Sequence, residues 1–441
     1  MRKGLLILLV LSLVGLAASA QKVVNVMPGW PGEQAPAFEK IVEAFEAENP
    51  DIDVVVEIVG RDRPTILATR LAGGNPPDLT PHPWIGLMKQ WADAGEIVDL
   101  TGLVDTSDIN PALVPIGEYD GGLYGLFIFP NVKSLIWYDP TDNFWYELCA
   151  KFPWLKICQQ IEYELPPYKD PRPLTWGDFV LIMQEAVEYG IAPLSIGLES
   201  GAASGWPGTD WIEDIMLRTA GAEVYDQWVN HEIPWTDERV KRAFEIFGGF
   251  FDSGFVLGGN TSALTTNFGD AADPLFRGHA LMHKQATFIQ GFINDHFEGL
   301  SPGTNYNIFA LPPIDPGATP DGSAPLLVSG DVVTVFDDRP EVIAFAQFLT
   351  SEAAANIWSS ELGELSAYVD ADPMQFDNPI TQKAQQMLLD ATVSRFDGSD
   401  LMPAEIGAGA FWTGIMDFIG GVPLDTVLEM IEAAALDAYG G

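Results

Sequence analysis

The sequence predicts an α/β fold, and three observations carry that prediction. A short apolar run at 23–27 is followed by an amphipathic helix, and a β-branched run at 52–59 follows the helix. A strand, a helix and a strand in that order form a right-handed crossover, which makes the two strands parallel. Similar units recur along the chain. With 47% hydrophobic residues, the 441-residue chain can also fill large cores, which excludes a disordered protein.

The first unit is defined by its spacing and by its ends. Its helix carries apolar residues three and four positions apart, the period of an amphipathic helix: Phe38, Ile41, Val42 and Phe45. The Gly- and Pro-rich stretch 28–32 ends the strand before it, and Asn49-Pro50 ends the helix. The run at 52–59 then returns as the second strand.

Later segments repeat these patterns. Residues 176–189 predict a helix that leads into a strand at 191–198, and 332–336 predict a strand followed by a helix. A last helix is expected at 424–436. The apolar positions of the later two helices lie on one face: Val342, Phe345, Ala346 and Leu349, then Leu424, Val427, Leu428 and Ile431. The sequence has no Ser/Gly-rich linker, so two domains would share strands and be interwoven.

The N-terminus has the pattern of a secretory signal peptide. Arg2 and Lys3 precede an apolar run at 5–16, and small residues follow at 18–20. The run is shorter than the roughly 20 apolar residues that span a bilayer, which disfavours a membrane anchor. We expect cleavage after residue 20. No Cys follows the cleavage site, so a lipid anchor is not expected and the predicted location is the periplasm.

The two cysteines, Cys149 and Cys158, lie close together in the sequence. In an oxidising compartment such a pair favours a disulfide over two free buried thiols. A metal site would need further ligands nearby, and the neighbouring sequence holds no further Cys and no His. No metal is therefore expected.

The charge is strongly one-sided, with 22 Lys+Arg against 62 Asp+Glu and a formal charge of −40. Nucleic acid and anionic lipid surfaces are recognised through Lys and Arg, so neither is expected as a partner. Solubility or adaptation to a salty medium explains the charge better than an acidic docking face does.

Motifs of enzyme chemistry are missing. The sequence has no Gly-x-x-x-x-Gly-Lys phosphate loop, no Gly-x-Gly-x-x-Gly turn after a strand and no Gly-x-Ser-x-Gly nucleophile motif. His279 and His283 lack the Glu of a zinc-protease motif. No cofactor is expected, and an enzyme is disfavoured. A secreted glycosidase stays open as the lesser alternative, because its two carboxylates need no fixed sequence spacing.

Several tryptophans lie beside Gly, Pro or polar residues, which predicts loop positions: Trp30, Trp84, Trp206, Trp211 and Trp412. An indole face packs against the C–H groups of a sugar ring, while the sugar hydroxyls need polar partners in the ring plane. Polar candidates of this kind are Glu33, Arg61, Asp62, Asp210, Gln285 and Asp331. For any single residue, loop packing or solvation explains the position equally well.

Landmarks along the chain follow one another in a defined order. Phe-Glu-Ala-Glu-Asn-Pro at 45–50 precedes Leu-Ala-Gly-Gly-Asn-Pro-Pro-Asp-Leu at 71–79, and Gly-Leu-Tyr-Gly-Leu at 122–126 precedes the stretch 131–138. Pro-Leu-Thr-Trp-Gly-Asp-Phe at 173–179 and Phe-Arg-Gly-His-Ala-Leu-Met at 276–282 follow. In this order, from about residue 23 to the C-terminus, the sequence resembles the sugar-binding proteins of bacterial ABC importers, the extracellular solute-binding proteins of family 1. Three stretches resemble the α-glucoside-type members: 205–211, 282–288 and 407–412.

The resemblance implies a periplasmic binding protein fold, in which two interwoven α/β lobes hold the ligand in a cleft at the hinge. The first lobe is expected at 21–130 and 287–325, and the second at 131–286 and 326–441. Hinge closure would bury the ligand, and the membrane permease of the importer would recognise the closed form. The segment 142–173 is longer than the family's usual connection.

The predicted function is capture of a small saccharide, an α-glucoside or short oligosaccharide, and its unchanged delivery to the permease by a monomer. Trp206 and Trp412 are expected to stack on the sugar, with Trp30 or Trp84 as the opposite wall. Hydrogen bonds would be accepted by Glu33, Asp62, Asp210 and Asp331 and donated by Arg61 and Gln285. A binding protein for a polyamine or peptide is the main alternative, and the glycosidase is the lesser one.

Overall fold

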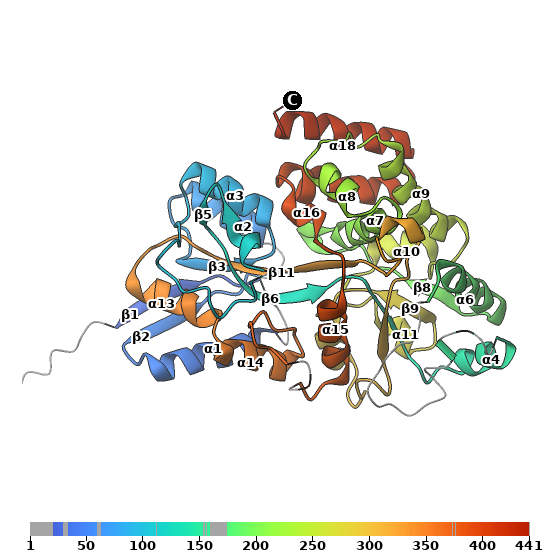
Figure 1. Ribbon diagram of the computed structural model, residues 1–441, viewed down its shortest axis with the longest axis horizontal. Helices are drawn as coiled ribbons and strands as arrows, with labels where there is room; N and C mark the ends of the chain where they lie inside the picture. Colours follow the sequence, from blue (N-terminus) through green and yellow to red (C-terminus); the bar gives the residue numbers. More distant parts are fainter. Residues whose placement is uncertain are drawn as a thin grey trace, which may run out of the picture.

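The computed structural model describes residues 21–29, 34–59, 63–111, 113–152, 155, 157–158, 174–372, 374 and 376–440. The expected signal peptide at 1–20 lies outside these residues, as do four expected ligand-binding residues: Trp30, Glu33, Arg61 and Asp62. Within the described chain, two α/β lobes form, each built around its own sheet (Figure 1). The predicted fold class is thereby confirmed.

The first lobe is organised around a sheet of six strands in the order β12-β11-β3-β1-β2, with β6 also paired to β11. β1 runs parallel to β2 and β3, as the predicted crossover requires, and β11 runs antiparallel to β3 and β6. The strands are β1 (Lys22–Val26), β2 (Ile52–Val56), β3 (Leu79–His82), β6 (Leu126–Val132), β11 (Leu326–Val335) and β12 (Ser394–Phe396).

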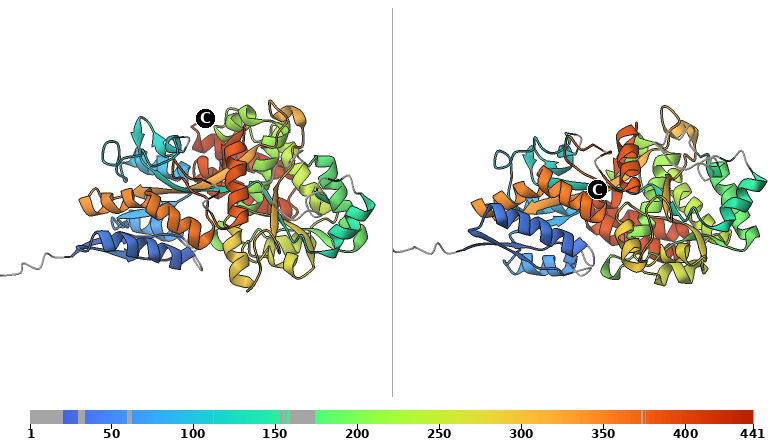
Figure 2. Two further views of the ribbon diagram at one scale, coloured as in Figure 1. Left: turned by 60° about the horizontal axis from the view of Figure 1, so that its bottom comes forward. Right: turned by 90° about the horizontal axis from the view of Figure 1, so that it is seen from below.

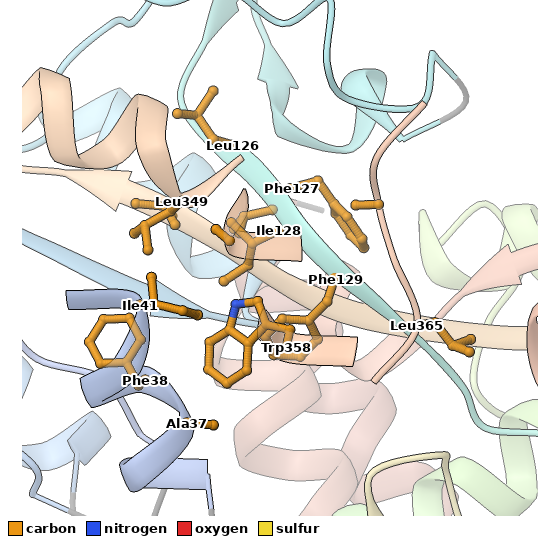
Figure 3. Packing of buried hydrophobic residues seen from close by; sticks show 14 of the residues in the cluster. Ala37, Phe38, Ile41, Leu126, Phe127, Ile128, Phe129, Leu349, Trp358 and Leu365 are labelled. Atoms are coloured by element: carbon orange, nitrogen blue, oxygen red, sulfur yellow. The ribbon is translucent and has the colours of Figure 1, made fainter. Parts of the chain in front are cut away.

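Helices pack on this sheet through aromatic side chains. Phe38 of α1 stacks on Trp358 of α14 with 6.0 Å between ring centroids, and Phe129 of β6 reaches the same indole at 5.1 Å. Figure 3 shows these side chains converging with Ile41 and Leu349. The elements of this lobe are α1 (Gln34–Glu48), α2 (Arg63–Ala72), α3 (Ile85–Ala94), η2 (Val114–Gly117), the hairpin β4 (Glu118–Tyr119) to β5 (Gly122–Leu123), α13 (Pro340–Leu349) and α14 (Glu352–Leu362).

The second lobe is built on a sheet of four strands in the order β10-β7-β9-β8. Its strands are β7 (Leu135–Tyr138), β8 (Ala192–Ser195), β9 (Ala280–Lys284) and β10 (Asn307–Ala310). Its larger helices are α4 (Asn143–Lys151), α6 (Trp176–Tyr189), α7 (Trp206–Thr219), α8 (Ala222–Val229), α9 (Glu238–Asp252), α17 (Trp412–Ile419) and α18 (Leu424–Ala438). Shorter elements are η3 (Gly201–Ala203), α10 (Gly259–Thr265), α11 (Asp273–Phe276), α12 (Ile289–His296), α16 (Gly398–Leu401) and the π-helix η6 (Glu405–Phe411).

The lobes are joined by strands that pass directly from one into the other. β6 leads into β7 with only Lys133 and Ser134 between them, and Figure 1 shows β6 and β11 running between the lobes. The return path from β10 through η4 (Pro316–Ala318) to β11 is held by Arg218, whose guanidinium donates to the carbonyls of Leu311 and Pro325 at 2.9 and 2.8 Å. The two views in Figure 2 show α15 (Pro379–Asp390) beside this crossing region.

The sheets depart from the expected lobe boundaries at two strands. β10 falls in the stretch 287–325 expected in the first lobe, but it pairs with β7 of the second. β11 falls in the stretch 326–441 expected in the second lobe, but it pairs with β3 and β6 of the first. All ten residues of β11 are buried. A strand that is buried along its whole length suits either sheet, because its sequence contains no marker of its partner.

The elements themselves follow the expected order. α6 has the predicted bounds, α1 and α18 contain their predicted helices, and β8 is shorter than the predicted strand at 191–198. A disulfide joins Cys149 of α4 to Cys158, with 5.2 Å between the Cα atoms. Among the described helices, none has both the length and the apolar character needed to cross a membrane.

Candidate functional site

A pocket opens between the two lobes and is lined by both. It encloses about 190 Å³ of space that water can enter. Its aromatic lining is Trp84, Phe129, Trp206, Phe268, Phe288, Phe292 and Trp412. Its ionisable lining is Arg63, Lys133, Asp331, Asp397 and Asp400, and the small polar residues Asn131, Ser329 and Ser399 complete the polar part. Large apolar surfaces and a few convergent polar groups are the usual composition of a small-molecule site.

The first-lobe wall is centred on Trp84, which immediately precedes α3. The guanidinium carbon of Arg63 lies 4.6 Å from the centroid of this indole, and the ring of His82 stacks on the indole at 5.7 Å. Arg63 also donates to the carbonyl of Pro81. Burial lowers the pKa of Arg63 to about 10, so the side chain stays charged at neutral pH. The wall therefore presents a fixed cation beside an aromatic ring.

The second-lobe wall begins at Trp206, the first residue of α7. Phe268 and Phe288 pack against the indole at 5.0 and 5.9 Å between centroids, and the Lys133 ammonium lies 5.2 Å from it. The preceding residue, Gly205, has φ +110°, and a Cβ there would lie 2.2 Å from the carbonyl oxygen of Trp412. Only glycine permits this turn and this approach, which bring the two tryptophans together.

Trp412 follows the π-helix η6 and is the first residue of α17. Its indole N–H donates to the Ser399 hydroxyl at 3.4 Å, and that hydroxyl donates to Asp397 at 2.8 Å. Trp206 and Trp412, together with Trp211, thus lie in helices, which corrects the expectation that they are loop residues. Each of the two pocket tryptophans begins a helix directly after glycine-containing or irregular backbone. In the sequence, such a helix start has the same residue pattern as a loop.

Beneath the aromatic walls lies a buried cluster of charges. The Lys133 ammonium contacts Asp210 at 2.8 Å and also forms an ion pair with Asp397. Burial acts against the charge of Lys133, but the surrounding carboxylates raise its pKa well above the ordinary value. Burial raises the pKa of Asp210 to about 6, opposed by Lys133. The Lys133 ion pairs join β6 and β7 to α7 and to the start of α16.

The first turn of α16 is held by acidic side chains. Glu213 accepts the backbone N–H groups of Gly398 and Ser399 at 2.9 and 3.0 Å. Asp397 accepts the N–H of Asp400 at 3.0 Å as the N-cap. Such acceptors satisfy the free donors of a helix start. The oxygen atoms of Asp210, Glu213 and Asp397 lie within 4.8 Å of one another, and the cation that pairs with two of them is Lys133.

A second ion-pair group connects α7 with the strands. Asp214 pairs with Arg218 and lies 3.3 Å from the Lys284 ammonium of β9. Asp214 also accepts the Ser134 hydroxyl at 2.7 Å, and the Ser134 oxygen accepts the N–H of Leu327 at 2.8 Å. These side chains are buried. The network therefore fixes both crossing strands against α7, directly behind the pocket.

The expected binding residues divide into three groups. Trp84, Trp206, Trp412 and Asp331 are brought together around the pocket. Asp210 lies behind the wall, where it binds Lys133 rather than facing the cavity. Gln285 also lies behind it, because its side-chain oxygen accepts the N–H of Ala286 at 2.9 Å and the residue is 3% exposed. The remaining four, Trp30, Glu33, Arg61 and Asp62, lie outside the described residues.

Several pocket residues were not predicted from the sequence. Lys133 falls in the stretch 131–138, which is only a landmark of the family resemblance, and Arg63 follows the predicted residues Arg61 and Asp62 directly. Asp397 and Asp400 had no distinguishing signal among 62 acidic residues. The run Asp-Gly-Ser-Asp at 397–400 does resemble a helix N-terminus, since Asp and Ser are favoured caps, but nothing in it indicates a pocket.

A second, larger hollow of about 530 Å³ lies on the first lobe around the β4–β5 hairpin. Its lining includes Tyr119 and Glu118 but no tryptophan and no Lys or Arg. Because it lacks the paired walls and the buried charges, we take the pocket between the lobes as the functional site.

Comparison with known proteins identifies relatives along nearly the whole chain. Residues 30–356 match the family model described as bacterial extracellular solute-binding protein. The chain is 34% identical over 419 residues to the osmoprotective compounds-binding protein GgtB of Synechocystis sp., covering 93% of this chain and 92% of that protein. It is 35% identical over 418 residues to the alpha-glucosides-binding periplasmic protein AglE of Rhizobium meliloti, covering 92% and 85%.

The fold also matches solved structures. A chitin oligosaccharide binding protein superimposes with a TM-score of 0.78 at 16% sequence identity, covering 96% of this chain and 100% of that one. At this identity the likeness concerns the fold alone. It independently supports the two-lobed architecture.

Proposed function

The chain belongs to the bacterial extracellular solute-binding proteins, and from that membership we propose that its inter-lobe pocket captures a small saccharide, an α-glucoside or short oligosaccharide, for an ABC importer. The observation that carries the proposal is the pairing of Trp84 on one lobe with Trp206 and Trp412 on the other around buried polar groups. A relative named for binding alpha-glucosides supports the same ligand class.

Each kind of pocket residue makes a different kind of contact with the saccharide. The indoles of Trp206 and Trp412 stack on the apolar faces of the sugar, and Trp84 closes the site from the first lobe. Asp331 accepts hydrogen bonds from sugar hydroxyls, and Arg63 donates them. Asp210 acts indirectly, because it fixes the Lys133 ammonium. Trp30, Glu33, Arg61 and Asp62 stay predictions for the same site.

The proposed route is export, capture and delivery. A signal peptide at 1–20 directs the chain to the periplasm, where it is cleaved and the protein acts as a soluble monomer without a lipid anchor. The ligand favours closure of the lobes, since it gains contacts from both walls only in the closed form. The permease subunits of the importer then receive the saccharide, and no covalent chemistry takes place.

Two alternatives share some of the same features. The carboxylates of the pocket suit a polyamine, but Arg63 and Lys133 place two cations in the same lining. A glycosidase would need one carboxylic acid and one carboxylate on either side of a scissile bond, and two of the three pocket carboxylates, Asp397 and Asp400, neighbour each other on one wall.

The test is a thermal-unfolding screen of residues 21–441, freed of any copurified ligand by unfolding and refolding. The panel contains α- and β-linked disaccharides, trisaccharides, peptides and spermidine, and each sample is also assayed for release of a chromogenic glycoside's label. A ligand that binds only the folded state stabilises it by about 2.7 kcal/mol at a hundredfold excess over Kd. A shift with α-glucosides and no hydrolysis is expected. A shift with spermidine alone, or turnover of the glycoside, would overturn the proposal.

A further inference from the structure

Asp400 has an unusual position in the pocket wall. Its side chain lines the pocket and is 6% exposed. Its backbone N–H donates to Asp397 at 3.0 Å, but no described residue donates a hydrogen bond to its carboxyl group. A buried carboxylate without a donor is costly, because a charge removed from water needs compensation. The group must find compensation in the ligand or lose its charge.

The charges that face Asp400 do not supply that compensation. The Lys133 ammonium is already paired with Asp210 and Asp397. It therefore stabilises an ionised Asp400 less than an unpaired ammonium would. Asp210 on α7 and Asp331 on β11 act against a negative charge on Asp400. Burial, and then the neighbouring carboxylates led by Asp397, raise the pKa of Asp400 well above its ordinary value.

The charged and polar side chains of the other elements packed against α16 interact with residues other than Asp400. Arg395 of β12 forms an ion pair with Asp226 at 2.6 Å, and Glu405 of η6 accepts from Gln90 of α3 at 2.7 Å. The Tyr225 hydroxyl of α8 donates to the carbonyl of Phe396 at 2.9 Å. On the first lobe, the Arg63 guanidinium acts electrostatically on Asp331. No further cation is therefore directed to Asp400 from the described chain.

From this arrangement we infer that Asp400 recognises the ligand as a neutral carboxylic acid, whose O–H donates a hydrogen bond to an oxygen atom of the saccharide. The inference rests on the proposed saccharide-binding function and deepens it. Sugar hydroxyl and glycosidic oxygens accept hydrogen bonds, whereas the ammonium groups of a polyamine only donate. A carboxylic acid held neutral in an apolar site is an effective donor at neutral pH. The wall therefore selects for uncharged, oxygen-rich ligands.

The proton on Asp400 makes binding depend on pH with a defined sign. A hydrogen bond from the O–H stabilises the protonated form, so the bound state holds the proton more tightly than the free state. Affinity is then constant on the acid side of the Asp400 pKa and falls on the alkaline side, by up to tenfold per pH unit. An ionised Asp400 accepting from a sugar hydroxyl would give the opposite slope.

The experiment is isothermal titration with the saccharide found in the screen, at about pH 5 to about pH 9, for wild type and three variants. Asp400→Asn keeps a donor and cannot ionise, so its affinity is expected to lack the wild-type fall on the alkaline side. Asp400→Leu lacks the donor and is expected to lose at least tenfold in affinity on the acid side. Asp252→Asn, an exposed position at the end of α9, is the control and is expected to follow the wild-type profile.

The outcomes separate the inference from the function on which it rests. If wild-type affinity rises with pH, or if Asp400→Asn keeps the wild-type slope, the inference is overturned while saccharide binding stands. If wild type binds no saccharide at any pH, the proposed function itself fails. Circular dichroism of Asp400→Leu checks folding, and the Asp400→Asn comparison decides the case even where the leucine variant does not fold.

Discussion

Trp206 offers an aromatic surface to the ligand and is held in place by its neighbours. It lines the pocket, packs on Phe268 and Phe288, and lies within 5.2 Å of the Lys133 ammonium. Replacing it by alanine removes a stacking surface without removing a charge. We expect Trp206→Ala to weaken saccharide binding at least tenfold, about 1.4 kcal/mol, as measured by calorimetric titration.

The matched control is Trp176→Ala on α6. Trp176 is also partly buried against phenylalanines, Phe179 and Phe250, but it does not line the pocket. Its loss is expected to lower stability and leave affinity unchanged. Equal affinities for wild type and Trp206→Ala would remove Trp206 from the binding site.

Lys133 contributes through its charge, which stabilises the fold, whereas Trp206 contributes a stacking surface for the ligand. In Lys133→Met the carboxylates of Asp210 and Asp397 lose their common buried cation. Breaking a buried pair by removing one partner costs about 3–5 kcal/mol, which urea unfolding at neutral pH measures. The double variant Lys133→Met/Asp397→Asn also removes one of the two carboxylates left without a cation. It is expected to regain part of the lost free energy of unfolding.

The surface pair of Lys241 and Asp425, at 2.6 Å, provides the comparison for Lys133. Lys241→Met is expected to change the free energy of unfolding little, since exposed pairs are weak. If Lys133→Met lowers the free energy of unfolding by as little as Lys241→Met does, the buried ion pairs of Lys133 do not stabilise the fold as proposed.

What the sequence can predict of single residues depends on how common each type is. Trp84, Trp206 and Trp412 stood out because tryptophan is rare and these lie beside Gly, Pro or polar residues, and the structure brings them together. Asp397 and Asp400 did not stand out, because the chain holds 62 acidic residues. Gln285 has a suitable side chain, but that side chain bonds to its own backbone neighbour. Side-chain direction of this kind is set by tertiary packing.

At the scale of elements, α3 and α16 meet across the two lobes. Gly86 of α3 approaches so closely that a Cβ would lie 1.8 Å from the carbonyl oxygen of Met402, just after α16. Gln90 of α3 donates to Glu405 of η6 at 2.7 Å. Both contacts lie beside pocket residues, Trp84 on one side and Asp400 on the other. We therefore expect contact between these elements to accompany closure around the ligand.

Gly86→Ala is expected to hold the lobes apart, because the new methyl group meets backbone rather than a movable side chain. Saccharide affinity should fall at least tenfold, and the radius of gyration with ligand, measured by small-angle X-ray scattering, should stay above that of liganded wild type. Gly177→Ala in α6 is the control, since the space around Gly177 is open and alanine is favoured in helices. Wild-type affinity and closure in Gly86→Ala would contradict this role of the α3–α16 contact.

The sequence predicts elements better than it predicts how they assemble. The bounds of α6 follow from its apolar period and from Thr175, whose hydroxyl accepts the N–H of Asp178 in a capping box. β10 and β11, in contrast, were expected in the wrong lobes, because strand pairing is decided by contacts between residues far apart in the sequence. The two-lobed architecture came from the family resemblance and not from periodicity.

For the whole molecule, the dominant electrostatic fact is the formal charge of −40. Self-repulsion of this size opposes the compact state, and salt screens it over a Debye length of about 10 Å at 0.1 M. We expect the unfolding temperature to rise between about 0.02 M and about 0.3 M KCl and then to level off. A temperature that is independent of salt, or that falls over this range, would show that the charges are balanced locally.

Saccharide binding between the lobes is best tested by a crystal structure grown with the saccharide from the screen. We expect one sugar in the pocket, stacked on Trp206 or Trp412, enclosed by Trp84 from the other lobe and hydrogen-bonded to Asp331 and Asp400. A sugar bound elsewhere on the molecule, with this pocket holding only water, would contradict it.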